Sequence, residues 1–240
     1  MGKLLLTLLL AVTASTSQAS SRLLVAVASN FEPAARALAS AFQQQHPAIA
    51  IQLSSAASGT HFHQIERGAP FAIFLSADQS YPKLLAEHGR GSELKLYARG
   101  TLVLACREGW DFSTAMQRIA SGEARVAIAN PNTAPYGRAA QQVLHREGLV
   151  APFVQGQNVG QTLNFLGAGA VDCAFAARSQ VMQKPSIAWS EVPAVYDPID
   201  QAGLLLQPNN PEATAFWHFL DSEGAKNIIA SHGYQAVPHD

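Results

Sequence analysis

Charged side chains are scarce in this sequence. Among its 240 residues, Lys and Arg number 16 and Asp and Glu number 17, so 14% of the chain is charged and the formal net charge is −1. Soluble domains usually have about a quarter of their residues charged, whereas the hydrophobic content of 48% is ordinary for a folded chain. This composition speaks against disordered segments, coiled coils and basic tails. We therefore expect a well-buried globular chain with no nucleic-acid partner.

Long hydrophobic runs are also absent beyond the N-terminus. Lys3, the apolar run 4–12 and the small residues Ser17 and Ala19 have the three-part pattern of a secretory signal peptide. The run is too short to span a bilayer, which takes about 20 residues, so a membrane anchor and a buried first helix are the weaker alternatives. We predict that residues 1–19 are a signal peptide cleaved after Ala19. The product would be periplasmic, with no membrane insertion and no cysteine for a lipid anchor.

Only two cysteines are present, Cys106 and Cys173, which is far from a disulfide-stapled scaffold. Each lies in an apolar run that is typical of a buried strand. An oxidising compartment would permit one bridge between them. Two buried thiols are equally consistent with the sequence, because spacing alone does not place their Cα atoms within reach.

The common catalytic signatures are missing. The chain has no G-x-S-x-G, P-loop, G-x-G-x-x-G or H-E-x-x-H motif. Ser58 lies near His61 and His63, but a serine at a helix start in an anion-binding turn explains it without catalysis. The two histidines would point to different faces of a helix, and no cysteine or third histidine is close in sequence. We predict a non-enzyme with surface histidines; the alternatives are a serine-based hydrolase and a metal-binding protein that uses His61 and His63.

Short apolar runs alternate with helical periodicity along the chain. The run 23–28 is typical of a buried strand, and apolar residues then recur at helical spacing from Phe31 to Phe42, before Pro47. Such βαβ repetition predicts parallel sheets covered by helices on both faces. The further strands that we predict are 49–53, 71–75, 102–105, 125–129, 153–155 and 173–176, and the further helices are 62–67, 138–147 (closed by Gly148) and 161–166 (closed by Gly167).

Because the pattern starts again after Gly100, we predict two α/β lobes of roughly a hundred residues each. Residues 20–99 and 201–240 would form lobe 1, and residues 100–200 would form lobe 2. The tail from Glu212 to Ile229 is helical and amphipathic. A chain that crosses twice between the lobes would return this tail to lobe 1.

Small or hydroxyl-bearing side chains mark four points where a predicted strand gives way to a helix. Helix N-termini present unpaired N–H groups and roughly half a positive charge. Ligands of open α/β sheets bind beyond the carboxyl ends of the strands, where these turns fall. Any one turn can be an ordinary helix cap, but two in each lobe predict an anion site. The turns are Ser29-Asn30, Ser58-Gly59-Thr60, 134–137 and 158–160.

Six segments carry a family resemblance over nearly the whole chain after the signal. They are VAVASNF (25–31), SAASGTHFHQIERGAPFAIFLSAD (55–78), LYARGTLVLA (96–105), IANPNTAPYGRAA (128–140), QNVGQTL (157–163) and FWHFLDSEGAKNIIASHGY (216–234). In this order they resemble the periplasmic molybdate-binding proteins of ABC-type molybdate transporters. No single segment is decisive, but the combination is specific.

The resemblance implies a two-lobed venus-flytrap fold of type II, in which each lobe is a mostly parallel sheet flanked by helices. A monomer without a cofactor would bind molybdate or tungstate in the cleft as a dehydrated oxyanion and deliver it to the membrane subunits of an ABC permease. No cation ligands are implied. The ligand groups implied at matching positions are Ser29 (hydroxyl and N–H), Asn30 (N–H), Ser58 (hydroxyl and N–H), Tyr136 (N–H) and Val159 (N–H).

Two positions, Ala72 and Arg178, depart from the family's pattern, and at a third, Ala177, the chain resembles the branch of the family that lacks a tyrosine ligand. Ala72 replaces the usual aspartate, which puts a supporting hydrogen bond in doubt. Some members use a tyrosine hydroxyl from a later strand, where this chain has Ala177, so we assign no ligand there. Arg178 follows that strand. It would either face solvent, as arginines at strand ends usually do, or approach the cleft and add a charge-assisted contact.

The donor-rich turns also select among oxyanions. Hydroxyls, amides and helix N-termini donate hydrogen bonds, so they suit a fully deprotonated dianion. Phosphate keeps a proton near neutral pH, and that proton would face donors at a cost of about 1–3 kcal/mol, with no carboxylate in the turns to accept it. Sulfate has the charge and shape of molybdate and is smaller. Sulfate therefore stays the alternative ligand, and only the resemblance favours molybdate.

Overall fold

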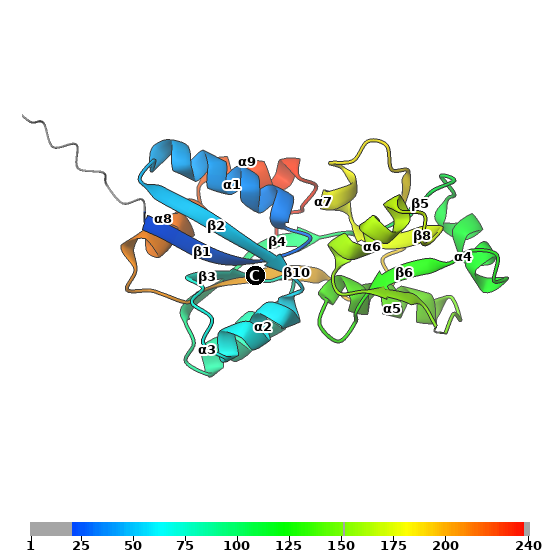
Figure 1. The fold of residues 1–240 in the computed structure, drawn as a ribbon, viewed down its shortest axis with the longest axis horizontal. Coiled ribbons are helices and arrows are strands. Elements are labelled where there is room, and N and C mark those ends of the chain that lie inside the picture. Colours follow the sequence, from blue (N-terminus) through cyan, green and yellow to red (C-terminus); the bar gives the residue numbers. More distant parts are fainter. Residues whose placement is uncertain (1–20, 151, 238–240) are drawn as a thin grey trace, which may run out of the picture.

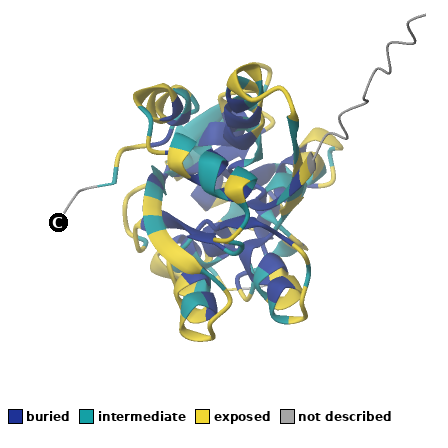
Figure 2. Ribbon diagram, turned by 90° about the vertical axis from the view of Figure 1, so that its left-hand side faces the viewer, coloured by how far each residue is buried: buried dark blue, intermediate teal, exposed yellow. Residues whose placement is uncertain are grey.

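The computed structural model describes residues 21–150 and 152–237. They form two lobes that lie side by side along the long axis of the molecule (Figure 1). Each lobe is built on a five-stranded sheet. Buried residues fill the strands and the inner helix faces, and exposed residues cover the outside (Figure 2). The predicted signal peptide, residues 1–19, lies outside the described residues.

The first sheet has the strand order β2-β1-β3-β10-β4. β1 pairs in parallel with β2 and β3, whereas β10 runs antiparallel between β3 and β4. β10 follows the second lobe in sequence, so this strand brings the chain back to the first. The strands are β1 Ser21–Ala28, β2 Ile49–Ala56, β3 Ile73–Leu75, β4 Ser92–Gly100 and β10 Ile199–Leu205.

Helices cover both faces of the first sheet (Figure 1). Successive side chains of a strand point to opposite faces, so Val25 and Val27 pack under one helical layer and Ala26 under the other. The tail packs in the core of this sheet and forms two helices, because Ser222 caps a second one. One face carries α1 Glu32–Gln45, α8 Pro211–Phe219 and α9 Glu223–Ser231; the other carries α2 Ser58–Glu66 and α3 Ser80–Glu87.

The second sheet has the order β7-β6-β8-β5-β9. β6 pairs in parallel with β7 and β8, and β5 runs antiparallel to β8 and β9. Its strands are β5 Leu102–Cys106, β6 Val126–Ala129, β7 Val154–Gly156, β8 Cys173–Ala177 and β9 Trp189–Glu191. Its helices are α4 Phe112–Ala120, α5 Pro135–Arg146, α6 Val159–Gly167 and α7 Arg178–Val181.

The two-lobed α/β fold is therefore confirmed, with mixed sheets. β10 and β5, the strands that follow the crossovers between the lobes, are the ones that run against their neighbours. β4 ends at Gly100 and β10 begins at Ile199, both in the first sheet. The lobe boundaries at 99/100 and 200/201 stay a prediction. We refer to the segments on either side of these crossovers as the hinge.

Three helices begin two to four residues earlier than predicted, α2 at Ser58, α5 at Pro135 and α6 at Val159. The predicted turns are thus the first turns of the helices themselves. Capping explains two of the starts, because proline suits the first helical position and the Asn158 side chain caps α6. Gly167 does not close α6; the left-handed residue beyond it is Gly169, with φ of 71°.

Cys106 and Cys173 are cross-strand partners on β5 and β8. They form a disulfide with their Cα atoms 4.1 Å apart. Of the two alternatives left open by the sequence, the bridge is the one observed. It lies at the end of these strands that is remote from the Leu102–Ala177 pair near the hinge.

Candidate anion-binding site

A small cavity lies between the lobes, where the carboxyl end of β1 meets the first turns of α2, α5 and α6. All five residues predicted as ligands line it, which brings together positions from both sheets. Among the described residues that line it, none carries a formal charge. The lining residues are Ala28, Ser29, Asn30, Ala56, Ala57, Ser58, Ala77, Ala134, Pro135, Tyr136, Asn158 and Val159.

Backbone N–H groups are the main donors at this cavity. Ser58, Tyr136 and Val159 lie in the first turns of their helices, where N–H groups have no partner within the helix. Within residues 21–150 and 152–237, the N–H groups of these three residues and of Asn30 donate to no other backbone group. The positive ends of three helix dipoles add to these donors. The cavity can therefore stabilise an anion without a formal positive charge.

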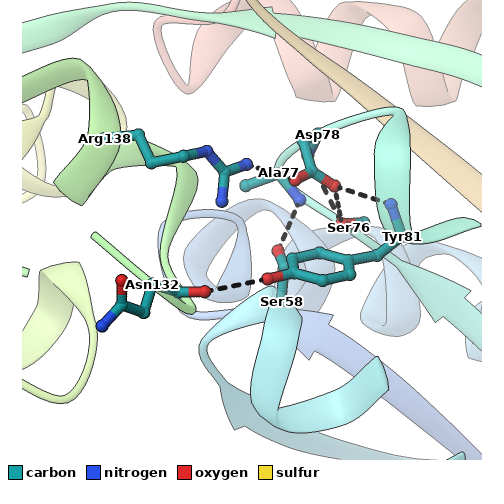
Figure 3. Close-up of polar contacts among 7 residues, drawn as sticks. All are labelled: Ser58, Ser76, Ala77, Asp78, Tyr81, Asn132 and Arg138. Atoms are coloured by element: carbon teal, nitrogen blue, oxygen red, sulfur yellow. Dashed lines mark hydrogen bonds and ion pairs between the residues drawn. The ribbon is translucent and has the colours of Figure 1, made fainter. Parts of the chain in front are cut away.

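Two hydroxyls complete the donor set. The Ser58 Oγ accepts a hydrogen bond from the Ala77 N–H at 2.9 Å (Figure 3), so its own proton stays available to donate. Ser29 differs from the expectation, because its N–H donates to the Ala56 carbonyl at 2.9 Å. That N–H extends the pairing of β1 with β2 and is not available to an anion. The contribution of Ser29 is reduced to its hydroxyl.

Behind the cavity lies a group of uncharged side chains that we call the inner network. The Asn30 Nδ2 donates to the Gln201 Oε1 and to the Tyr234 hydroxyl, each at 3.0 Å. The Ser179 hydroxyl donates to the Asn30 carbonyl at 2.9 Å, and the Gln180 Nε2 donates to the Ser29 carbonyl at 3.0 Å. The members of the inner network that are linked to one another by hydrogen bonds are Asn30, Tyr97, Tyr136, Ser179, Gln201 and Tyr234, and we include Gln180, which binds the neighbouring Ser29 carbonyl.

The inner network joins the lobes and orients the β1–α1 turn. Ser179 and Gln180 belong to α7 of the second lobe, which lies beside the β1–α1 end of the first (Figure 1). Both carbonyls of the turn are bound from behind, which leaves the Asn30 N–H directed toward the cavity. Burial raises the pKa of Tyr97, Tyr136 and Tyr234, so these hydroxyls stay protonated near neutral pH.

A second group of contacts, which we call the rim cluster, also joins the lobes. The Arg138 Nη2 lies 2.5 Å from the Asp78 Oδ2, and the Tyr81 hydroxyl donates to the Asn132 carbonyl at 3.1 Å (Figure 3). Asp78 also accepts from the Tyr81 N–H at 3.3 Å. The Arg138 side chain is 40% exposed and that of Asp78 is 12% exposed. The rim cluster, Asp78, Tyr81, Asn132 and Arg138, is thus charged and partly solvated.

Gly59 lets the two backbones meet beside the rim cluster. Its N–H donates to the Thr133 carbonyl of the other lobe at 2.9 Å. A Cβ at this position would lie 2.6 Å from the Tyr81 hydroxyl and 3.0 Å from the Thr133 Cα. A larger residue at position 59 would therefore displace the Tyr81 side chain and press on the Thr133 backbone.

The three positions compared above with the family pattern all lie outside the cavity lining. Ala72 is buried in the core of the first lobe, and its N–H donates to the Leu24 carbonyl. Ala177 is buried at the start of α7. The Arg178 Nη1 lies 3.6 Å from the Glu191 Oε1, and its guanidinium stacks over the Trp189 ring at 5.7 Å. Arg178 therefore makes no cleft contact in this structure.

The prediction of surface histidines is wrong for one of the two. His63 is exposed, whereas His61 is 0% exposed with its Nδ1 3.1 Å from the Gln64 Oε1. The i and i+2 positions point to different faces of α2, and the face with His61 and Ile65 packs on the sheet. Burial lowers the pKa of His61. Among the described residues, no group of three or more His, Cys, Asp or Glu could hold a metal ion.

Several residues that lie at or beside the cavity were not predicted from the sequence to belong to the site. Asp78, Arg138 and Tyr234 lie within segments that we quoted for the family resemblance, whereas Gln201 lies between two such segments. One signal was available, because Asp200 and Gln201 lie near the start of a strand that is apolar in the rest of its length, and a buried amide requires partners. Its partners are far away in sequence, so the signal alone would not have located the site.

Comparison with known proteins places this geometry in a family. Residues 23–235 match the sequence profile of a family described as bacterial extracellular solute-binding protein. The molybdate-binding protein ModA of Azotobacter vinelandii is 34% identical over 226 residues, which cover 88% of each chain. ModA of Rhodobacter capsulatus is 33% identical over 226 residues, or 90% of this chain and 89% of that one. The solved structure of the A. vinelandii periplasmic molybdate-binding protein gives a TM-score of 0.82 at 31% identity, covering 90% of this chain and all of that one (100%).

Proposed function

This chain belongs to the family of bacterial extracellular solute-binding proteins, and we propose that it captures molybdate, with tungstate as a mimic, and delivers it to an ABC-type importer. Its relatives from A. vinelandii and R. capsulatus are molybdate-binding proteins. The observation that carries the proposal is the uncharged cavity, which is lined by N–H and hydroxyl donors from both lobes. Its ligand would be held by Ser29, Asn30, Ser58, Tyr136 and Val159, with no catalytic step.

The chemistry of the lining supports a fully deprotonated dianion. No carboxylate lines the described cavity, so the proton of a hydrogen phosphate would have no good acceptor there. An unmatched polar group of this kind costs about 1–3 kcal/mol, which is roughly a 5- to 150-fold loss of affinity. Molybdate, tungstate and sulfate bring no such proton. Size would then decide among these three.

The placement of the donors supports capture by closure. Ser29, Asn30 and Ser58 belong to the first lobe, while Tyr136 and Val159 belong to the second. An anion can contact all of them only when the lobes are closed, so its binding shifts the population toward the closed form. We infer that the closed surfaces of the two lobes form the docking face for the permease.

Among residues 21–150 and 152–237, no helix has the length and apolarity needed to cross a membrane. Two observations support an exported protein. The sequence pattern of residues 1–19 is that of a signal peptide. The Cys106–Cys173 disulfide suits an oxidising compartment such as the periplasm. We therefore propose that the mature protein works in the periplasm, as a monomer.

A thermal-shift screen against molybdate, tungstate, sulfate, phosphate and chromate tests the ligand. A ligand that binds only the folded state stabilises it by about 2.7 kcal/mol at a hundred times its Kd. We expect large shifts with molybdate and tungstate at concentrations where phosphate has no effect. A large shift with sulfate and none with molybdate would show that the ligand assignment is wrong.

The double variant Ser29→Ala/Ser58→Ala tests the site. It removes both hydroxyls while leaving the backbone in place, and we expect it to abolish the molybdate shift. Ser222→Ala is the matched control, because the Ser222 hydroxyl caps α9 by accepting from the Ala225 N–H at 3.2 Å and does not line the cavity. An unchanged molybdate shift in the double variant would place the ligand elsewhere.

A further inference from the structure

We propose that Gln201 is a positioning residue that couples the two halves of the anion site. This inference rests on the proposed function and adds a residue that does not touch the ligand cavity. Gln201 lies on β10, the strand by which the chain returns from the second lobe to the first. Its side chain is 0% exposed. A buried amide is costly unless its groups are bonded, so its partners account for its presence.

Two of the partners of Gln201 are the side chains of ligand residues, one from each lobe. Its Oε1 accepts from the Asn30 Nδ2 at 3.0 Å, and its Nε2 donates to the Tyr136 hydroxyl at 3.4 Å. Asn30 and Tyr136 both present a free backbone N–H at the cavity. One amide therefore connects two residues that line the cavity from the two different lobes.

The orientation of the amide is determined by its surroundings. The oxygen end of the amide faces a donor, because the Asn30 Nδ2 donates to the Gln201 Oε1. The Tyr97 hydroxyl lies 3.1 Å from the same oxygen and shares its single proton with the Ser76 carbonyl at 2.8 Å. The NH₂ end must then face Tyr136. An amide held in one orientation by bonds at both ends can transmit the position of one turn to the other.

Gly100 leaves the amide no room to move. A Cβ at Gly100 would lie 2.1 Å from the Tyr136 hydroxyl and 2.7 Å from the Gln201 Nε2. Gly100 is the last residue of β4, at the crossover into the second lobe. The contact between Gln201 and Tyr136 is therefore packed against the hinge itself, and a change in hinge angle alters the relation of the two ligand turns.

The neutrality of Gln201 is part of the proposal. Its partners are a neutral amide and tyrosine hydroxyls whose pKa values are raised by burial. A carboxylate of the same shape at this position would add a negative charge behind a dianion site, in a medium of low dielectric constant. A protonated carboxyl group would restore both the acceptor and the donor of the amide.

The first experiment compares the wild type with Gln201→Met, which keeps the length of the side chain without its hydrogen bonds. Molybdate affinity is measured by calorimetry, together with the unfolding temperature of the ligand-free protein. We expect affinity to fall by roughly 10- to 100-fold, the usual effect of removing a group that orients a ligand residue. The control is Asn210→Ala, which removes the cap of the remote helix α8 (Figure 1); it should lower the unfolding temperature and leave affinity unchanged.

The outcomes separate this inference from the proposed function. Failure of the wild type to bind molybdate would overturn both. Binding by the wild type with unchanged affinity in Gln201→Met would overturn the inference alone. If Gln201→Met does not fold, Tyr136→Phe takes its place, because it removes only the hydroxyl that Gln201 contacts and keeps the ligand N–H; unchanged affinity in that variant would also overturn the inference.

A pH profile of Gln201→Glu distinguishes positioning from a merely structural role. At each pH the molybdate affinity of the variant is divided by that of the wild type, which cancels any change in the ligand. We expect the variant to bind at least tenfold more weakly at pH 8 and to approach the wild type as acid protonates the carboxylate. A ratio that does not change with pH would contradict the role that we assign to Gln201.

Discussion

Two groups of side chains join the lobes on either side of the anion cavity, and their chemistry differs. The inner network is neutral and buried, with Gln201 0% and Asn30 1% exposed. The rim cluster contains the ion pair Asp78–Arg138, whose arginine side chain is 40% exposed. Both groups adjoin the cavity. Asn30 of the inner network lines it, and so does Ala77, the neighbour of Asp78 in the rim cluster.

The difference indicates a division of tasks. A formal charge beside the cavity would attract any anion without distinguishing one from another, so the groups that orient the ligand donors are dipoles. A partly exposed ion pair is weaker than a buried one and is screened by salt, which suits a contact that would form and break in the closure that we propose. In the structure, Arg138 pairs with Asp78 and so balances the charge of a carboxylate that would otherwise repel a dianion nearby.

The largest effect on molybdate affinity is expected from Gly100→Ala, which disturbs the packing of the inner network. The added methyl group would overlap the Tyr136 hydroxyl, so Tyr136 and Gln201 must move apart. Overpacking of this kind costs about 1–3 kcal/mol, and we expect molybdate affinity to fall about 100-fold, measured by calorimetry. Gly224→Ala is the matched control, because no atom lies within 4 Å of a Cβ built there. Equal molybdate affinities of Gly100→Ala and Gly224→Ala would contradict the claim that the inner network orients the ligand donors.

An intermediate effect is expected from Arg138→Met in the rim cluster. It leaves Asp78, which is only 12% exposed, unpaired close to the anion, and we expect affinity to fall about tenfold at low salt. The loss should shrink at about 1 M salt, where the screening length is about 3 Å. The double variant Asp78→Asn/Arg138→Met should regain part of the affinity. A loss that ignored salt would mean that the rim acts by packing and not by charge.

The smallest effect is expected when the pH is raised from 7 to 9, because the tyrosines of the inner network keep their protons in this range. The pKa values of Tyr97, Tyr136 and Tyr234 are raised by burial, so the folded state keeps these protons longer than the unfolded state. Stability from these groups is complete below the unfolded pKa of about 10 and is lost as the pH rises above it. We expect the unfolding free energy contributed by the network to be flat from pH 7 to pH 9 in urea titrations. A fall of the unfolding free energy between pH 7 and pH 9 would contradict this prediction, because it would show that the network loses a proton in that range.

The sequence predicts the parts of this site that depend on local pattern. The turns with small polar residues predicted an anion site, because ligands of open α/β sheets bind beyond the carboxyl ends of the strands. The family resemblance, and not this pattern, assigned Ser29, Asn30, Ser58, Tyr136 and Val159 as its ligands. The predicted start of α2 is four residues too late. Its N-cap residue, Ala57, makes no side-chain hydrogen bond, so the sequence contains no capping side chain that would indicate the start.

The inner network escaped prediction because its contacts are long-range. Asn30 is 171 residues from Gln201 and 204 from Tyr234 in sequence, and a single sequence does not specify such pairs. The burial of His61 was missed for a related reason. Which face of α2 meets the sheet depends on packing against Phe71 and Phe74, and polar residues on both faces conceal it.

The central claim is that an uncharged cavity holds a dianion by dipoles alone, and proton-linked calorimetry tests it most directly. Molybdate is titrated into the protein at pH 7 in several buffers of different ionisation enthalpy. Because no group that lines the described cavity titrates near neutral pH, binding should exchange no protons, and the binding enthalpy should be the same in every buffer. An enthalpy that varies with the buffer by about one proton per anion would contradict the account, because a titrating group would then take part in holding the ligand.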